Sequence, residues 1–213
     1  MSALITPVGT LSFPALFEAR KVDPTDETEV PKFSASIIFD EEAQATPLYA
    51  AMKEAALAAA IAEFGPDAPE LLQSGKLNWP FIAGPSASAP EGTTVIRIRS
   101  KNRPGVVSLI PDPTTGRPMA ITDANELYAG AQVRASVGAF AYNMPINKGV
   151  SFGLNNVQKV GDGERLDGRV AASDEFAADA SLEADLSSMD KDAGETATSA
   201  PAEATGPTLA ALL

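Results

Sequence analysis

Residues 128–160, YAGAQVRASVGAFAYNMPINKGVSFGLNNVQKV, hold two alternating stretches that flank a short polar segment. Successive side chains of a strand point to opposite faces, so an alternating pattern predicts a strand with one buried face. The segment between the stretches contains the turn formers Asn143, Pro145, Asn147 and Gly149, which predicts a hairpin. In the first stretch the apolar positions are Val133, Ala135, Val137, Ala139 and Ala141, and the alternate positions are Arg134, Ser136, Gly138, Phe140 and Tyr142.

The face opposite the apolar one carries an arginine and two aromatic rings. A cation can neutralise a phosphate and a ring can stack on a base, which is the combination that single-stranded nucleic acid requires. Taken alone, the hairpin leaves a second interpretation equally open. Phe140 and Tyr142 can be rim aromatics that cover a barrel end, and Arg134 can be a solvated charge.

A second stretch, TTVIRIRSKNRPGVV at 93–107, also alternates. Its four cations, Arg97, Arg99, Lys101 and Arg103, share one face of the predicted strand with no acid among them. Their charges repel one another unless an anion lies across them. A charged edge strand that resists aggregation is the alternative. Two cationic strands favour a nucleic-acid surface. One parity of this stretch holds Val95, Arg97, Arg99, Lys101 and Arg103, and the other holds Ile96, Ile98 and Ser100.

The remaining pattern predicts a mainly β protein with one clear helix over residues 41–64. Asp40 or Thr46 can cap that helix, and Gly65-Pro66 ends it. Trp79 is expected to anchor a long loop rather than to stack on a base. The helix repeats Leu48, Met52, Ala55, Ala56, Ala59 and Ala60 at helical spacing. We further predict a strand and a turn within 3–20, a strand at 32–40, irregular structure at 66–92, a turn at 111–119 and a short helical or turn segment at 121–130.

Composition excludes several functions. The chain has no cysteine and no histidine, which rules out disulfides, thiol nucleophiles, Cys/His zinc sites and histidine-based catalysis. No apolar run approaches the roughly 20 residues of a membrane span, and the N-terminus lacks the basic start of a secretion signal. We therefore expect a cytoplasmic protein without a cofactor or a metal.

Charge is strongly segregated along the chain. The formal net charge is -12, yet the segment 97–159 holds eight bases against three acids. From Asp174 to Leu213 there are nine acids and one base, Lys191. This last part is also poor in aromatic residues, so it cannot bury enough apolar surface to offset its ordering entropy. We predict a binding domain at 1–172 and a disordered acidic tail at 173–213, whose apolar end TLAALL can act as a docking peptide.

Four segments together resemble a family of phage and prophage single-stranded DNA-binding proteins: PKFSASIIF (31–39), SKNRPGVV (100–107), LYAGAQVRASVGAFAY (127–142) and NKGVSFGLNNVQKVGDGERLDGR (147–169). The likeness covers roughly residues 5–176. It implies an OB-fold, a five-stranded Greek-key barrel, with an inserted helix. It also implies a helix-destabilising function in replication, recombination and repair, and an acidic tail that contacts replication or recombination proteins and competes with DNA.

We accordingly expect single-stranded DNA as the partner, bound without sequence preference. The expected DNA-binding residues are Arg97, Arg99, Lys101, Arg103, Tyr128, Arg134, Phe140, Tyr142 and Lys148, while Phe152 is expected in the core. A homodimer and binding of RNA are both left open. This chain departs from better-known relatives because its acids are spread out and its end is Leu212-Leu213 instead of an aromatic residue.

Two rival functions can be weighed against DNA binding. A phage structural or decoration protein would bind particles and show no salt-sensitive binding of oligonucleotides. A metal-dependent nuclease would need carboxylates near the basic strands. Asp112, Asp123 and Glu126 lie there, but their spacing is not that of a metal site, and turn and cap roles suit them better.

Overall fold

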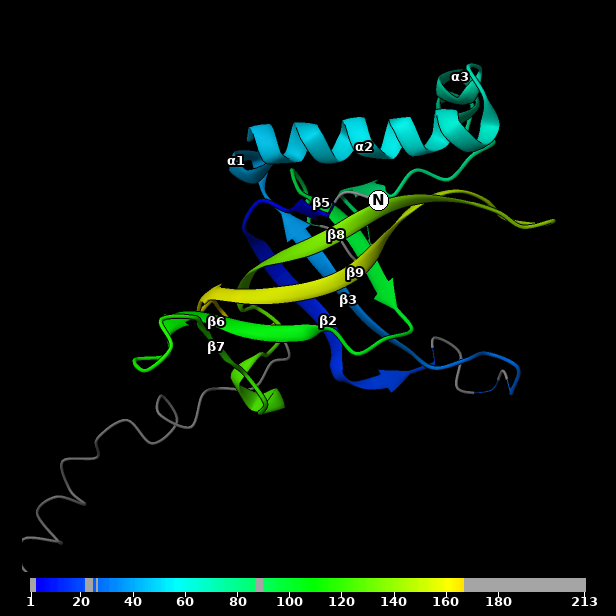
Figure 1. The fold of residues 1–213 in the computed structure, drawn as a ribbon. Coiled ribbons are helices and arrows are strands. Elements are labelled where there is room, and N and C mark those ends of the chain that lie inside the picture. The colour runs from blue at the N-terminus through cyan, green and yellow to red at the C-terminus, as the bar shows by residue number, and fades with distance from the viewer. Residues whose placement is uncertain (1–2, 22–24, 26, 87–89, 167–213) are drawn as a thin grey trace, which may run out of the picture. The chain divides into compact units, whose positions relative to one another are not determined.

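The computed structural model describes residues 3–21, 25, 27–86 and 90–166 (Figure 1). They belong to one compact unit, and the tail predicted at 173–213 lies outside them. The strands are β1 (Leu4–Ile5), β2 (Gly9–Arg20), β3 (Lys32–Phe39), β4 (Phe81–Ala83), β5 (Thr94–Ser100), β6 (Gly105–Pro111), β7 (Pro118–Ala120), β8 (Gln132–Asn143) and β9 (Lys148–Gly161). The helices are α1 (Glu41–Gln44), α2 (Pro47–Phe64), α3 (Ala68–Gln73) and a 3-10 turn at Ala124–Glu126.

Five of the strands close into a ring. β8 pairs with β9 and also with β2, so the pairings run β2–β3–β5–β9–β8 and return to β2. β5 is parallel to β9, and the other pairs of the ring are antiparallel. Beyond the ring, β6 continues along the same edge of β9 and carries β7 (Figure 1). The fold is mainly β, as the sequence predicted.

The inner face of the ring is the core. Val133, Ala135 and Val137 of β8 are buried, which confirms the predicted alternation. Phe152 of β9 is fully buried, as expected, and its ring lies 5.6 Å from that of Phe81. The hairpin that dominates the sequence therefore supplies the core on one face and leaves its other face to solvent.

The predicted helix at 41–64 is two helices. The Asp40 carboxylate accepts a hydrogen bond from the Ala43 amide at 2.8 Å and caps α1, whereas the Thr46 hydroxyl accepts one from the Tyr49 amide at 3.3 Å and caps α2. Pro47 explains the break, because proline lacks an N–H and disfavours helical geometry in the residue before it. Both predicted caps are thus used, one on each helix.

The buried face of α2 differs from the predicted one by one residue. Met52, Ala56 and Ala60 are buried as expected, but Leu48 is 47% exposed and Tyr49 is buried in its place. The Tyr49 ring meets the rings of Phe39 at 5.6 Å and Phe81 at 5.3 Å in edge-on contacts. An aromatic ring buries more surface than leucine, so the helix turns Tyr49 toward the core.

The segment 66–92 is more regular than predicted, because it contains α3 and β4. Trp79 is partly buried against the core, with its ring 5.3 Å from that of Phe81, which supports the predicted anchor role. The neighbouring Asn78 donates its amide to the Lys148 carbonyl and accepts from the Val150 amide. These bonds fasten the segment to the start of β9.

Candidate nucleic-acid interface

The outer face of β5, β9 and β8 brings two of the predicted cations beside a predicted ring. Arg99 pairs with Gly153 of β9, and Gly153 pairs with Gly138 of β8. The preceding outward residue of β5 is Arg97, two positions before Arg99. The following outward residue of β8 is Phe140, two positions after Gly138. Both arginines are exposed. The strands that carry these residues are far apart in the sequence, and the parallel β5–β9 pairing joins them.

Glycines make the floor between the arginines and the ring. A Cβ atom placed on Gly153 would lie 3.8 Å from Cε1 of Phe140, so the ring leans over β9 toward Arg99. A Cβ atom on Gly138 would meet no atom within 4 Å, which means that its outer side is open. Ser151 of β9 pairs with Phe140 and is half-buried on the same face, so only backbone and one small side chain lie between the cations and the ring.

Lys101 and Arg103 do not share the strand face predicted for them. β5 ends at Ser100, and both residues lie exposed in the turn that leads to β6. A turn begins at the end of the strand, where the Ser100 hydroxyl accepts a hydrogen bond from the Asn102 amide at 3.1 Å. Val95, which was assigned to the same face, is buried. The cationic face of β5 therefore consists of Arg97 and Arg99, and Lys101 and Arg103 lie in the loop that follows the strand.

Tyr142 and Lys148 lie at the β8–β9 turn, next to Phe140 along the hairpin. Tyr142 pairs with Gly149, and Asn143 pairs with Lys148. The Tyr142 hydroxyl is 3.4 Å from Oδ1 of Asn147, which also accepts a hydrogen bond from Asn78 Nδ2 at 2.6 Å. These bonds hold the turn against the loop that carries Asn78, so Tyr142 and Lys148 have a fixed support.

Arg134 lies on the same outer face, about 20 Å along β8 from Phe140 at 3.3 Å per residue. Its Nε donates to Oε1 of Gln158 at 2.7 Å, and Nε2 of Gln158 donates to the Ser108 carbonyl at 3.1 Å. This chain of bonds spans β8, β9 and β6 and orients the guanidinium. Sequence reasoning gave Gln158 no role, although its place in the string LNNVQ is an outward one.

Tyr128 is separated from the other predicted residues. Its hydroxyl donates to Oδ1 of Asp162 or the Gly163 carbonyl, each at 3.1 Å, and the Arg165 guanidinium lies 4.2 Å from the ring centroid. Lys159 Nζ lies 2.7 Å from the same Asp162 carboxylate. The hydrogen bonds from Lys159 and then Tyr128 lower the pKa of Asp162 below its ordinary value. Tyr128 thus belongs to a local cluster at the end of β9.

Comparison with family models and curated proteins shows the family of the chain. The family model described as "Enterobacter phage Enc34, ssDNA-binding protein" matches residues 2–187. The chain belongs to this family. No curated protein matches it. Membership of the Enc34 family identifies a binding protein rather than an enzyme, as the sequence predicted, and favours that function over a decoration protein.

Two solved structures of phage proteins resemble the chain. The single-stranded DNA-binding protein from bacteriophage Enc34 in complex with ssDNA has a TM-score of 0.57 at 16% identity, over 76% of this chain and 88% of that one. The single-stranded DNA-binding protein gp2.5 encoded by bacteriophage T7 has a TM-score of 0.55 at 11% identity, over 80% of this chain and 98% of that one. At these identities the likeness shows a shared fold.

The acids near the basic surface have the structural roles expected of them. Oδ1 of Asp112 accepts hydrogen bonds from the amides of Thr114 at 2.7 Å and Thr115 at 2.9 Å. These amides lower the pKa of Asp112. Asp123 caps the 3-10 turn by accepting from the Asn125 amide at 2.8 Å. Within the described residues no group of three carboxylates, histidines or cysteines could hold a metal ion, and no described helix could cross a membrane.

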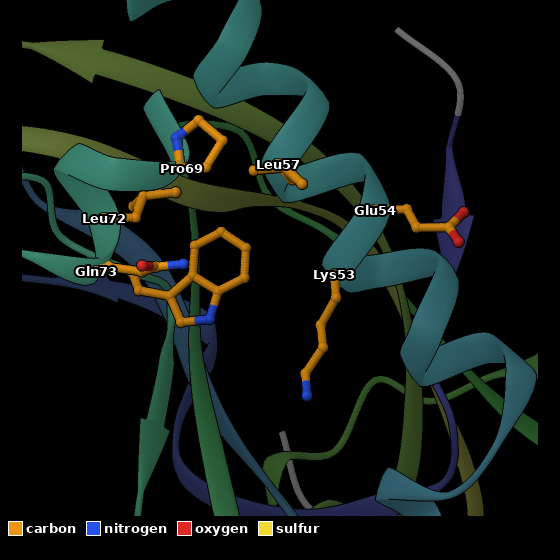
Figure 2. Close-up of a pocket in the computed structure, with 7 residues that line it drawn as sticks. Lys53, Glu54, Leu57, Pro69, Leu72 and Gln73 are labelled. Atoms are coloured by element: carbon orange, nitrogen blue, oxygen red, sulfur yellow. The ribbon is translucent and has the colours of Figure 1, made fainter. Parts of the chain in front are cut away.

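A cleft of 460 Å³ separates α2 from α3 and is mostly apolar. Figure 2 shows Leu57 of α2 facing Pro69 and Leu72 of α3, and Trp79 completes the lining. Its rim carries Lys53 and Glu54, whose charges oppose each other. The cleft is therefore no place for a phosphate backbone, and the cationic outer face of the sheet is the better candidate in this Enc34-family protein.

Proposed function

We propose that this chain coats single-stranded DNA without sequence preference, through the outer face of β5, β9 and β8. The observation that carries the proposal is the surface on which Arg97 and Arg99 of β5 and Phe140 of β8 lie on either side of the small residues Ser151 and Gly153 of β9. The arginines neutralise phosphates, and release of the condensed counterions drives binding. Phe140 and Tyr142 stack on bases, which is sequence-tolerant because every base has a π-face.

The predicted cations other than Arg97 and Arg99 extend the path of the DNA. Lys148 lies at the turn beyond Tyr142, and Arg134 lies toward the opposite end of β8. Lys101 and Arg103 flank the path from the loop after β5. Tyr128 has a weaker case, because one of its ring faces is covered by Arg165. Since the protein binds only the unpaired form, it shifts the duplex equilibrium toward melting by mass action.

We infer that the domain is an OB-fold. The ring of five strands supports this, since an OB-fold is a five-stranded Greek-key barrel. OB-folds bind oligonucleotides on the face of their second and third strands and with the loops beside it. In the ring, the second and third strands along the chain are β3 and β5, and β5 carries Arg97 and Arg99. The inserted helix corresponds to α2.

The remaining assignments follow the sequence. We propose a DNA-binding domain at 1–172 and an acidic segment at 173–213 that recruits replication or recombination proteins. Its nine acids are expected to lower the affinity for DNA by adding negative charge to the same chain. The setting would be phage-type replication, recombination and repair in the cytoplasm of a bacterial host. The homodimer stays a prediction.

Fluorescence anisotropy of labelled oligo-dT tests the proposal, with the full chain and a chain that ends at Ala172 measured across a salt series. We expect tight, salt-dependent binding that strengthens on truncation. Equal binding by both chains would retain the surface and remove the role of the acidic segment. No binding by either chain at low salt would refute the proposed function. It would favour the alternative, a phage structural or decoration protein.

A further inference from the structure

Phe13 of β2 is an exposed aromatic residue in an unfavourable backbone conformation. Its side chain is 71% exposed, and its φ angle is +47°. Within the part of the chain that the structure describes, no other residue except glycine has a positive φ. Such a conformation is unfavourable for a residue with a side chain, and it persists where the surroundings impose it or where function uses it.

A β-bulge places Phe13 in this position. Ser12 pairs with Ser36 of β3 and Ala15 pairs with Ser34, so Phe13 and Pro14 together stand opposite one residue, Ala35. The bulge itself has a packing reason, because it lets Leu11 and Leu16 both reach the core although they differ in parity. The packing does not require a phenylalanine at the bulge. Glycine would adopt the positive φ without strain.

The ring of Phe13 lies outside the barrel. Its neighbours on the inner face, Leu11, Leu16 and Ala35, are all buried, and a ring that is mostly exposed cannot lie among them. Within the described residues no ring contact of Phe13 with another aromatic residue is present. The ring therefore offers its surface to solvent on the outer side of β2.

The bulge lies next to the row of arginines. The residues of β3 beside it, Ser36 and Ser34, pair on their other edge with Arg97 and Arg99. Two strand spacings of about 4.8 Å put Phe13 roughly 10 Å from the arginines on one side. Phe140 lies the same number of strands away on the other side, since β9 separates β5 from β8. The arginines are thus midway between two exposed rings.

We propose that Phe13 is a further base-stacking residue, which together with Phe140 borders the phosphate-binding pair of Arg97 and Arg99. This proposal rests on the proposed function, because it assigns a further residue to the same DNA surface. A single DNA strand that crosses the sheet from β8 to β2 places its phosphate backbone over the two arginines and stacks one base on Phe140 and another on Phe13. The strained backbone of Phe13 then holds the ring outward before DNA arrives, which lowers the ordering cost of binding.

The Phe13→Gly variant separates binding from folding. Removing the ring should weaken oligo-dT binding by about 5- to 150-fold, which is the range for loss of one base stack. Glycine relieves the positive φ, so the melting temperature should stay equal or rise. Phe13→Tyr keeps a ring and should bind within about twofold of the original chain. Ile61→Ala removes an exposed apolar side chain from α2 and should change neither quantity.

Unchanged affinity of Phe13→Gly beside a binding original chain would overturn this proposal and leave the proposed function intact. A fall in melting temperature that accompanies the loss of affinity would also overturn it, because Phe13 would then be structural. Failure of the original chain to bind would refute both. As a second readout, Phe13→Trp in a Trp79→Phe background should show tryptophan fluorescence that oligo-dT quenches, and absence of quenching at saturation would contradict stacking.

Discussion

The double variant Arg97→Ala with Arg99→Ala tests the assigned surface most directly. Each arginine that contacts a phosphate adds about 0.7 to the slope of log K against log salt for single strands. Loss of both should therefore lower the slope by about 1.4. Extrapolated from 1 M, where the counterion contribution vanishes, this corresponds to an affinity about 25-fold weaker at 0.1 M salt.

The fold should tolerate this change. Both arginines are exposed, and their neighbours in the adjacent strands are the small residues Ser34, Ser36 and Gly153. Removing two cations from one strand also relieves their mutual repulsion. Thermal unfolding of the double variant should thus match the original chain within a few degrees.

The measurement is anisotropy of labelled oligo-dT from 0.05 to about 1 M salt, with slopes compared between variants. Lys76→Ala with Arg117→Ala provides the matched control, because it removes two exposed cations at the end of α3 and in the β6–β7 turn. Both double variants change the net charge equally. A slope reduced to the same extent in the control would show that total charge matters instead of position, and an unchanged slope in Arg97→Ala with Arg99→Ala would refute the assigned surface.

Three further predictions concern the floor, the end of β9 and the helix cap. Gly138→Glu should weaken oligo-dT binding without lowering the melting temperature, since its outer side is open, whereas Gly138→Lys should bind at least as tightly; equal binding by the two would contradict a DNA path there. The lowered pKa of Asp162 means that its bond to Lys159 stabilises the fold fully above the ordinary carboxyl pKa and loses this effect as pH falls through the lowered pKa. Asp162→Asn should therefore melt lower than the original chain at about pH 7, and the difference in melting temperature should shrink as pH falls below the ordinary carboxyl pKa. Thr46→Ala should cost about 1 kcal/mol of unfolding free energy by denaturant titration, because the Tyr49 amide loses its acceptor, and a cost near zero would indicate that water replaces the cap.

The strands that alternate were predictable from the sequence, and so were both helix caps. In β3 and β8 the buried apolar residues lie at alternate positions, so period two appears directly in the sequence. In β9 the buried positions change parity between Leu154 and Val157, where the register with β8 shifts. The helix break was missed because the Ala-rich pattern continues through Pro47. The end of β5 was missed because Arg103 keeps the parity of Arg97, while the strand ends at Ser100, where a turn begins.

The candidate site could be predicted as a set of residue types but not as an arrangement. Arg99 and Gly138 lie on either side of Gly153. This arrangement depends on the parallel pairing of β5 with β9, two segments that are distant in the sequence, and local patterns do not encode such a pairing. The exposure of Phe13 was hidden for a related reason. A bulge shifts the alternation of side chains by one residue. Phenylalanine rarely adopts a positive φ, so its presence at position 13 does not predict the bulge.

The two strands at the ends of the sheet are very short. β1 has two residues and β7 has three, and β7 begins with Pro118, which has no amide hydrogen to offer. A protein that covers a nucleic acid brings many copies of itself into close contact, which is the situation in which free strand edges join and aggregate. With so little unpaired ladder at either border, the sheet offers few backbone groups through which two copies could join edge to edge.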